Sequence, residues 1–472
     1  MTNITEKVNL TNKASFFEAC QIVAEDIQTI EKSSPFIIFS HFDADGLAAA
    51  SILAATLSQA DINFQIRILE RLEYKTLNNL KDTLPHESTI IFSDIGTGVL
   101  EAFSQWKTSQ EIFILDHHSP TSKIELSGNI RHLNPHNYSI NGATELSGAG
   151  VVYFVSIHLN PQNKYLAPLA LIGALGDRQD QGEYSSVIGL NKLIVEDAKK
   201  LEMVSDNVSV WFFDRTRPII SVLRRAEFLG FENEIEIRAF LEKLEIPFKK
   251  GDDERNFYDL NEEECRRLAS ELIVQYNIDP DEIYKRDYQL IREEINFLKD
   301  ARVFASKLNA CGKLQRHDIG ISLCLGDRQT TLRDLKLVEN EYSRIIAQNL
   351  KWALSEGHLQ ELTSIHLLDG RKSINERMIG TIISILSSRR DINPKPFLGC
   401  ALTASGRVKI SMRLSRFQDQ VIDLGRLLNQ VVQDVEPESE VGGHDAAAGA
   451  IISETFLDDF IAQINHLIKE GL

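Results

Sequence analysis

The stretch PFIIFSHFDADGLAAASILAA, residues 35–55, indicates the fold class of this 472-residue chain. Residues 35–40 form an apolar run rich in β-formers, and Gly46 turns the chain directly into a helix of small residues from about 47 to 60. Further short strand-like runs, separated by helical or polar stretches, lie at 62–68, 89–93 and 112–115. This is the spacing of βα units, which predicts an α/β fold with a mainly parallel sheet and helices on both faces.

The rest of the chain divides by its patterns into three further parts. Helices expected at 147–160, with Ser147 as N-cap, and at 165–175 complete the first α/β domain. A smaller C-terminal α/β domain is expected from strands at 365–368, 397–403 and 408–414, and helices at 374–388 and after Glu454. The predicted boundaries are 1–225 for the N-terminal domain, 226–300 for an acidic helical insertion, 301–360 for a connecting segment and 361–472 for the C-terminal domain.

The overall charge excludes a protein that binds polyanions through bulk positive charge. Lys and Arg number 51 against 68 Asp and Glu, which gives a net charge of −17. Segment 227–294 holds 20 acidic and 10 basic residues, in helical pieces such as 262–276, whereas segment 366–416 holds 10 basic and 3 acidic residues. A nucleic-acid site is therefore expected as a local patch, in the C-terminal domain.

The cysteines and the apolar runs indicate where the protein works. The five cysteines are odd in number and widely spaced, which fits reduced thiols better than disulfides or a zinc site. No apolar run approaches the roughly 18 residues that a membrane span needs. We therefore expect a cytoplasmic protein with no membrane partner.

Acidic and histidine residues recur in four loops at the ends of predicted strands or helices. The loops contain His41-Phe-Asp43-Ala-Asp45-Gly46, Asp94, Asp116-His117-His118 and Asp177. Aspartate after a strand also caps helices, and a single loop histidine means little. Four such loops together favour another explanation, because clustered carboxylates repel one another unless divalent cations neutralise them. Mixed Asp and His ligands suit a pair of hard cations.

A phosphate-holding surface is predicted near the C-terminus. Arg407, Lys409 and Arg413 alternate along one predicted strand and so point to the same face. Gly442-Gly443-His444, with Gly449 beyond it, is predicted as a turn whose backbone N–H groups can approach a phosphate. The alternatives are an edge strand protected by charge for the first motif and a plain hairpin or helix-entry turn for the second.

At these residues the chain resembles the DHH phosphoesterase family, and within it the RecJ-like nucleases, especially the archaeal branch. The motifs that carry the resemblance are Asp43-Ala-Asp45-Gly46, Ser93-Asp94-Ile95-Gly96, Asp116-His117-His118, Ala174-Leu175-Gly176-Asp177, Leu308-Asn309-Ala310-Cys311-Gly312 and Gly442-Gly443-His444. Each motif is weak alone, but six in the family's order are specific. The resemblance implies an N-terminal DHH domain, a C-terminal DHH-associated domain and a two-metal catalytic cleft.

The resemblance also implies a role for each candidate residue. Asp43 and His41 would bind one Mn²⁺ or Mg²⁺ ion, Asp45, His117 and Asp177 the other, and Asp94 would bridge both. His118 would face the scissile phosphate, and Asp116 would orient His117 or His118. Asn309 and the late set Arg407, Lys409, Arg413, Gly442, Gly443 and His444 would contact the substrate.

The expected function is that of a metal-dependent exonuclease on single-stranded DNA or RNA, in DNA replication or repair. Two alternatives stay open. One is a phosphatase for short oligonucleotides or bisphosphonucleotides, and the other is a replisome scaffold with little activity. For the archaeal branch the resemblance implies partnership with the GINS complex, and the acidic insertion is a candidate docking surface.

Overall fold

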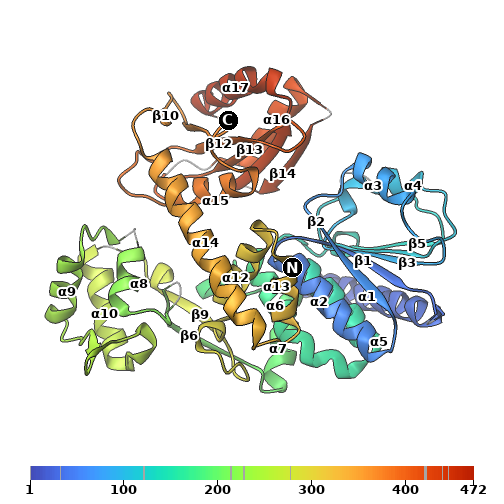
Figure 1. The fold of residues 1–472 in the computed structure, drawn as a ribbon, viewed down its shortest axis with the longest axis horizontal. Helices are drawn as coiled ribbons and strands as arrows, with labels where there is room; N and C mark the ends of the chain where they lie inside the picture. The colour runs from blue at the N-terminus through green and yellow to red at the C-terminus, as the bar shows by residue number, and fades with distance from the viewer. Residues whose placement is uncertain are drawn as a thin grey trace. The chain divides into compact units, whose positions relative to one another are not determined.

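The computed structural model describes residues 2–31, 33–120, 123–212, 215–226, 229–276, 278–418, 422–437, 439–444 and 446–471. The chain divides into two compact units. Figure 1 shows its helices and strands, coloured along the chain from blue at the N-terminus to red at the C-terminus. Unit 1 comprises residues 1–219 and 244–339, and unit 2 comprises residues 220–243 and 340–472.

Unit 1 is built on a five-stranded sheet whose strands are all parallel, as the sequence predicts. Its strands are β1 (Phe36–His41), β2 (Phe64–Leu69), β3 (Thr89–Ser93), β4 (Ile112–Leu115) and β5 (Ile130–Leu133). Their order in the sheet is β2-β1-β3-β4-β5. The chain moves to one side of β1 for β2 and to its other side for β3, so the strand order reverses between β1 and β3. Ligands of open α/β sheets bind at such a reversal, beyond the carboxyl ends of the strands.

Helices cover both faces of this sheet. On one face, Ile37 and Phe92 share a hydrophobic core with Leu77 of α3 (Tyr74–Lys81) and Phe103 of α4 (Leu100–Ser104). On the other face lie α2 (Ala44–Gln59) and α5 (Gly148–Leu159), and α5 begins at the predicted N-cap Ser147. Unit 1 also contains α1 (Thr2–Thr29), α6 (Ala167–Gly176), α7 (Gly189–Lys200), α12 (Ala301–Lys313) and α13 (His317–Cys324).

A two-stranded antiparallel ribbon bounds the acidic insertion. Strand β6 (Val204–Val210) pairs along its whole length with β9 (Tyr284–Leu290), from Val204 opposite Leu290 to Val210 opposite Tyr284. The chain between the two strands forms α8 (Ile219–Arg225), α9 (Glu234–Lys243), the short pair β7 (Lys249–Lys250) and β8 (Asp253–Glu254), α10 (Glu262–Tyr276) and α11 (Pro280–Ile283). Helix α10 has the bounds that the sequence predicts.

The C-terminal part of unit 2 is a six-stranded mixed sheet with its own core. Its strands are β10 (Leu359–Glu361), β11 (His366–Asp369), β12 (Phe397–Leu402), β13 (Val408–Arg413), β14 (Glu440–His444) and β15 (Ala447–Ile452), in the order β10-β11-β12-β13-β15-β14. Helix α15 (Glu376–Leu386) contacts β12 and β13. Helices α16 (Leu424–Val435) and α17 (Leu457–Glu470) contribute to one hydrophobic core with β13 and β15.

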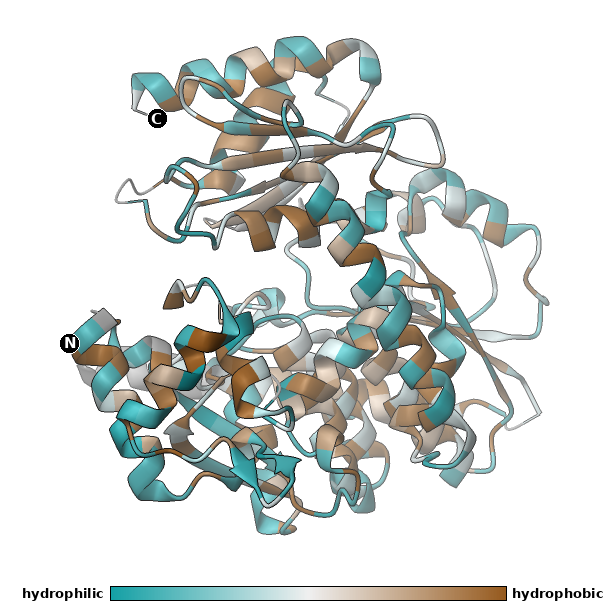
Figure 2. Ribbon diagram, turned by 60° about the vertical axis from the view of Figure 1, so that its left-hand side comes forward, coloured by the Kyte–Doolittle hydropathy of each residue, from teal (hydrophilic) through white to brown (hydrophobic). Residues whose placement is uncertain are grey.

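Hydropathy along α17 explains how this last helix is held. Leu457, Phe460, Ile464 and Ile468 are buried, which is the spacing of a single helix face. Figure 2 shows the resulting alternation of brown and teal along the helix that ends at the label C. The helix therefore closes the core of this sheet with one face and presents the other to water.

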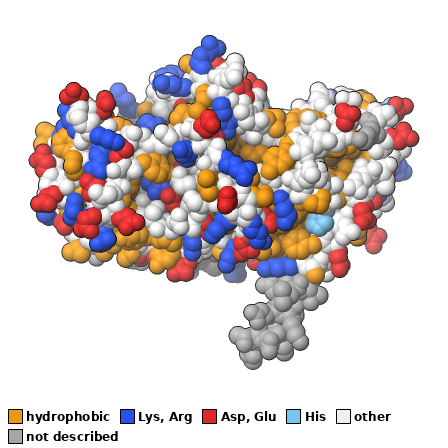
Figure 3. Space-filling model, turned by 90° about the horizontal axis from the view of Figure 1, so that it is seen from below, with side chains coloured by type: hydrophobic (Ala, Val, Ile, Leu, Met, Phe, Trp, Pro, Cys, Tyr) orange, Lys and Arg blue, Asp and Glu red, His pale blue; other side chains and the backbone are white. Residues whose placement is uncertain are grey.

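The surface carries charges of both signs. In the view of Figure 3 acidic and basic side chains are interspersed, so the net charge of −17 does not gather on this face as one field. Within the described ranges, no helix is both long enough and apolar enough to cross a membrane.

Candidate metal centre

The predicted metal-binding loops meet at the carboxyl edge of the parallel sheet. His41 is the last residue of β1, Asp94 follows β3, and Asp116 follows β4. Because these three strands are neighbours and run in the same direction, their ends lie side by side. The chemistry-bearing residues therefore gather at the reversal of strand order.

Among the described residues, three groups of side chains have ligand atoms that lie within 4.8 Å of one another. One group is Asp94, Asp116, His117 and His118, and the other two are the candidate ligand sets predicted above. One set is His41, Asp43 and Asp94, and the other is Asp45, His117 and Asp177.

Asp94 faces both sets. Its Oδ2 lies 3.7 Å from His41 Nδ1, and its Oδ1 lies 3.1 Å from His117 Nε2. The carboxylate of Asp94 therefore points one oxygen towards each set, which is the arrangement that a bridging ligand needs.

Backbone N–H groups at the starts of two helices fix Asp43 and Asp45. Asp43 is the N-cap of α2 and accepts a hydrogen bond from Gly46 N at 3.0 Å. Asp45 accepts hydrogen bonds from Gly148 N at 2.7 Å and from Ala149 N at 3.0 Å, in the first turn of α5. Helix N-termini favour negative charge, so both carboxylates are held in place by the fold.

Asp94 is the residue whose surroundings point most directly to a cation. Its side chain is 2% exposed, and neither carboxylate oxygen accepts a hydrogen bond from any described residue. Burial, followed by the nearby Asp45 and Asp43, raises the pKa of Asp94 well above its usual value. A buried carboxylate without donors is costly unless a cation neutralises it, so these residues fit a divalent metal.

Asp116 holds the two histidines that follow it. Its Oδ2 accepts from Thr97 N at 2.8 Å, and its Oδ1 accepts from His117 N at 2.8 Å. The same Oδ1 lies 2.8 Å from His118 Nδ1. Burial alone would raise the pKa of Asp116, but His118 and these hydrogen bonds outweigh burial and hold the pKa well below its usual value.

The protonation of the histidines follows from the acidic surroundings. Burial lowers the pKa of His117, but Asp177, Asp45 and Asp116 outweigh burial and raise it to about 9. Burial also lowers the pKa of His118, and Asp116 outweighs it, so the net direction is upward. Burial raises the pKa of Asp177. Without cations, the cluster therefore holds protons that metal ions would displace.

Helix α12 carries the fifth motif against the first metal loop. Asn309 Oδ1 accepts a hydrogen bond from Ala44 N at 3.0 Å, and its Nδ2 donates to Gly176 O at 3.4 Å. Gly312 lies one turn later, where a Cβ atom would stand 1.9 Å from Phe42 O. Both residues support the loop between β1 and α2 from the same face of α12.

The remaining predicted substrate residues lie in unit 2. Lys409 and Arg413 share a face of β13, opposite the buried Val408, Ile410 and Met412. Arg413 Nε donates to Ser384 Oγ of α15 at 3.1 Å, and its Nη1 donates to Met412 O at 2.7 Å.

Arg407, which precedes β13, donates from Nη2 to Ser439 Oγ at 2.7 Å and to Ile451 O at 2.8 Å. Gly442 and Gly443 belong to strand β14 and pair with Gly449 and Ala448, whereas the sequence suggests a turn there. His444 is the last residue of β14, and its side chain lies outside the described part.

Sequence reasoning missed the polar residues that hold the ligands. Gln179 and Asn191 are both buried and form a hydrogen-bonded pair beside His117 and Asp177. Asn134 donates to His118 O at 2.9 Å and to Thr97 Oγ1 at 3.1 Å. Single amide residues follow no periodic pattern in the sequence, so most of these residues could not be found from it. The exception is Asn134, because an asparagine directly before a proline is typical of a helix N-cap.

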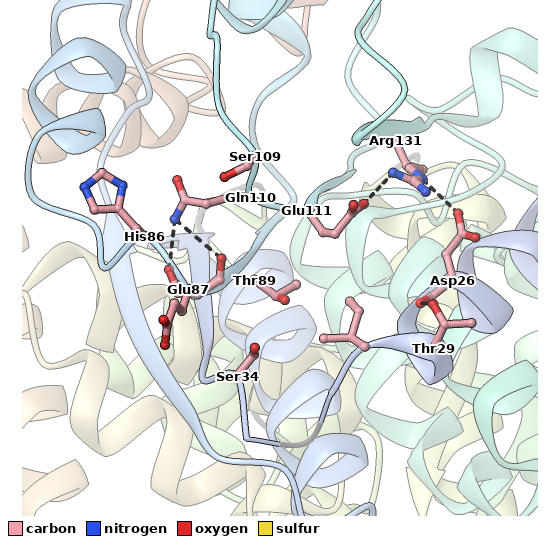
Figure 4. A pocket seen from close by; sticks show the side chains of 12 residues that line it. Asp26, Thr29, Ser34, His86, Glu87, Thr89, Ser109, Gln110, Glu111 and Arg131 are labelled. Carbon is pink, nitrogen blue, oxygen red and sulfur yellow. Dashed lines mark hydrogen bonds and ion pairs between the residues drawn. The ribbon is translucent and has the colours of Figure 1, made fainter.

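A polar pocket of about 330 Å³ lies at the opposite, amino ends of the strands (Figure 4). It is lined by the end of α1, by residues at or just before the starts of β1, β3 and β4, and by Arg131 of β5. Arg131 in this pocket contacts Asp26 of α1 at 2.8 Å and Glu111 at 2.5 Å. The pocket contains none of the candidate metal ligands.

Two family models match this chain. The DHH family, N-terminal domain, matches residues 35–174, and the DHHA1 domain matches residues 363–470. A relative, the uncharacterized protein MJ0831 of Methanocaldococcus jannaschii, is 28% identical over 443 residues, which cover 92% of this chain and 93% of that protein.

Solved structures share the fold at low sequence identity. RecJ from Thermus thermophilus, in complex with Mn²⁺, matches with a TM-score of 0.57 and 17% identity over 96% of this chain. The match covers 55% of that RecJ chain, so the present chain spans about half its length. CDC45 from Entamoeba histolytica matches with a TM-score of 0.60 and 13% identity, over 94% of this chain and 98% of its own. With a DHH domain around the acidic cluster and a DHHA1 domain at the C-terminal end, the chain belongs to the DHH family and shares its fold with RecJ.

Proposed function

We propose that this protein is a metal-dependent exonuclease that hydrolyses phosphodiester bonds of single-stranded nucleic acid, with DNA as the main substrate. The observation that carries the proposal is the position of Asp94, which is buried, accepts no hydrogen bond from any described residue and points one oxygen at a histidine of each ligand set. This geometry suits two divalent cations, and we propose Mn²⁺ or Mg²⁺ because oxygen ligands outnumber nitrogen ligands.

Each candidate ligand is proposed to bind one of the two ions, and Asp94 to bind both. His41, Asp43 and Asp94 would hold one ion, and Asp45, His117, Asp177 and Asp94 would hold the other. When bound, such a pair of cations neutralises phosphate oxygens and activates water. The fold supplies the ordering of the ligands, because helix N-termini, Asp116 and Asn309 hold them before any substrate arrives.

His118 is proposed to act on the substrate. Its side chain is 56% exposed, whereas that of Asp116, which lies 2.8 Å from its Nδ1, is 1% exposed. The buried carboxylate keeps the imidazole protonated and leaves its other nitrogen free to point away from Asp116. His118 can therefore contact the scissile phosphate or give a proton to the leaving oxygen.

Two features support a nucleic-acid substrate over a small phosphate ester. RecJ, an exonuclease, shares the fold, and the local excess of basic residues at 366–416 includes Lys409 and Arg413 on one face of β13. We propose that this face holds the phosphates of the strand, with Arg407, Gly442, Gly443 and His444 beside it.

The likeness to CDC45 favours a second candidate, a replisome scaffold that pairs with a complex such as GINS. A scaffold has no need of metal ligands, yet each of the eight candidate residues at the sheet edge is present in this chain. Hydrolysis is therefore the leading proposal, and the two roles are compatible.

An end-labelled DNA strand incubated with Mn²⁺ tests the proposal. We expect release of mononucleotides, complete loss of activity in excess EDTA and a loss of at least about a thousandfold in Asp94→Ala. Asp197→Ala is the matched control. Asp197 lies on α7, accepts a hydrogen bond from Tyr153 Oη at 3.0 Å and is not a candidate metal ligand. Undiminished hydrolysis in EDTA, or a requirement met by Zn²⁺ alone, would refute the two-metal proposal.

A further inference from the structure

The end of α6 places a glutamine directly behind the candidate metal ligands. Asp177 is the C-cap of α6, and Arg178 has a φ of +60°. Arg178 N donates to Leu175 O and Gln179 N donates to Ala174 O, which together form a Schellman motif. This helix ending turns the chain back, so the side chain of Gln179 returns towards Asp177 and is fully buried.

The amide of Gln179 uses both of its N–H groups at the candidate metal site. Its Nε2 donates to Asp177 Oδ2 at 2.8 Å and to Gly142 O at 2.8 Å. Its Oε1 accepts a hydrogen bond from Asn191 Nδ2 at 2.7 Å. The opposite orientation of this amide would place an oxygen against a carboxylate and a carbonyl, so Asn191 and the two acceptors together fix the orientation.

Gly142 connects this amide to His117. His117 Nδ1 lies 2.7 Å from Gly142 O, and Gln179 Nε2 lies 3.4 Å from the same nitrogen. A lone pair on Nδ1 would face the carbonyl oxygen at close range, so the arrangement favours a proton there. The lone pair of the neutral ring then belongs to Nε2, which faces Asp45, Asp94 and Asp177 as a metal ligand must.

Asn191 anchors the amide pair to the rest of the unit. It is 1% exposed, its N donates to Glu145 O at 2.9 Å, and its Oδ1 accepts from Ser147 N at 3.4 Å. Glu145 and Ser147 immediately precede α5, whose first turn holds Asp45. Asn191 and Gln179 therefore connect the three side chains of one ligand set, Asp45, His117 and Asp177.

We propose that Gln179 and Asn191 are positioning residues that set the affinity of the second metal ion, the one assigned to Asp45, His117 and Asp177. The inference rests on the proposed function and deepens it. Neither residue touches a metal or the substrate. Gln179 orients Asp177 directly and His117 through Gly142, and Asn191 holds the amide of Gln179 in the orientation that does so.

Calorimetric titration of Mn²⁺ into the metal-free full-length protein tests this proposal. Gln179→Met keeps the length of the side chain but removes its hydrogen bonds, and Asn191→Leu leaves Gln179 without its anchor. Gln110→Met is the matched control, because Gln110 is another buried amide of unit 1, and its Nε2 donates to Pro85 O at 2.8 Å and Ser88 Oγ at 3.1 Å, around the pocket of Figure 4.

We expect the wild type to bind two Mn²⁺ ions and Gln179→Met to bind one of them about 10- to 100-fold more weakly. Asn191→Leu should weaken the same ion by a smaller factor, and Gln110→Met should bind both as the wild type does. The Mn²⁺ concentration for half-maximal hydrolysis should rise in the same order, with activity partly regained at saturating Mn²⁺.

The outcomes separate this inference from the proposed function. If Gln179→Met and Asn191→Leu bind both ions as tightly as the wild type, the inference is overturned and the exonuclease proposal stands. Equal weakening in all three variants overturns it as well, because the effect would then be that of removing any buried amide. A wild type that binds no Mn²⁺ overturns the proposed function together with the inference.

Discussion

Asp94 is held in a conformation and an environment that both oppose folding. Its φ of +57° lies in the left-handed region, which costs most residues other than glycine free energy. Its carboxylate is buried beside Asp43 and Asp45 without a hydrogen-bond donor among the described residues. Such costs persist where function requires them, and here they place one carboxylate between two ligand sets.

Asp94→Asn is therefore expected to stabilise the metal-free protein while it abolishes hydrolysis. Asparagine tolerates the left-handed conformation and removes the buried charge. A folded-state pKa above the unfolded value means stability that is present at acid pH and lost as pH rises through the folded pKa. The gain of Asp94→Asn over the wild type should therefore increase as the pH rises above about 4, the ordinary pKa of an aspartate in an unfolded chain. Denaturant unfolding in excess chelator measures it, and equal stabilities at high pH would contradict the expectation.

Asp116 offers a second test at the scale of one residue. Asp116→Asn removes the negative charge that raises the pKa of His118. Burial, which lowers that pKa, is then no longer outweighed, so the pKa of His118 should fall. Proton NMR titration of the His118 ring in the metal-free protein measures the change. Hydrolysis should fall about 10- to 100-fold while both Mn²⁺ ions still bind. An unchanged His118 titration would show that the contact of 2.8 Å between Asp116 and His118 is absent in solution.

At the scale of elements, close approach of α12 to the first metal loop depends on one glycine. A Cβ at Gly312 would lie 1.9 Å from the backbone oxygen of Phe42, so Gly312→Ala must displace either the helix or the loop. We expect lower thermal stability and weaker Mn²⁺ binding. Gly98→Ala is the control, since nothing lies within 4 Å of a Cβ there and its φ is not positive. If both variants bind Mn²⁺ like the wild type, α12 does not set the shape of the loop.

The basic side chains of β13 are expected to bind single-stranded DNA. Lys409→Ala combined with Arg413→Ala should weaken binding of single-stranded DNA at every sequence tested. The slope of log K against log salt should fall by about 0.7 for each phosphate that the variant no longer neutralises. Asp177→Ala should leave this slope unchanged and abolish turnover. An unchanged slope in the double variant would place the phosphates on another surface.

The sequence predicts those elements whose residues repeat a pattern. Strands β1, β3 and β4 are uninterrupted apolar runs, and each is followed by a loop with Asp or His, so both the sheet and the site's location follow from the sequence. Strand β5 reads Ile130-Arg-His-Leu133, which contains too few apolar residues to be recognised. Gly442 and Gly443 suggest a turn because glycine is unfavourable in strands, yet pairing with β15 keeps them extended.

The support behind the ligands was not predictable for a different reason. Gln179 and Asn191 are far apart from most of their partners in sequence, and an isolated amide residue has no characteristic spacing. Their hydrogen bonds to the ligands form only in the tertiary structure, which packs α7 against α6. Motif spacing therefore locates the ligands but not the hydrogen bonds that orient them.

At the scale of the whole molecule, the candidate metal ligands all belong to unit 1, and the core of the C-terminal sheet belongs to unit 2. Mn²⁺ should therefore raise the melting temperature of one unfolding transition and leave a second one unchanged. At a hundredfold excess of free Mn²⁺ over the dissociation constant, each bound ion adds about 2.7 kcal/mol of stability. Calorimetric scans with and without chelator measure this, and an equal shift of both transitions would mean that the units unfold together.

The antiparallel pairing of β6 with β9 brings together the two ends of the segment between them. Val210 and Tyr284 are partners, so everything from residue 211 to 283 starts and finishes at almost the same point in space. A segment with adjoining ends can lengthen, shrink or be exchanged during evolution at little cost in chain closure. A change in the length of the segment between β6 and β9 therefore need not move the strand ends that carry the candidate metal ligands.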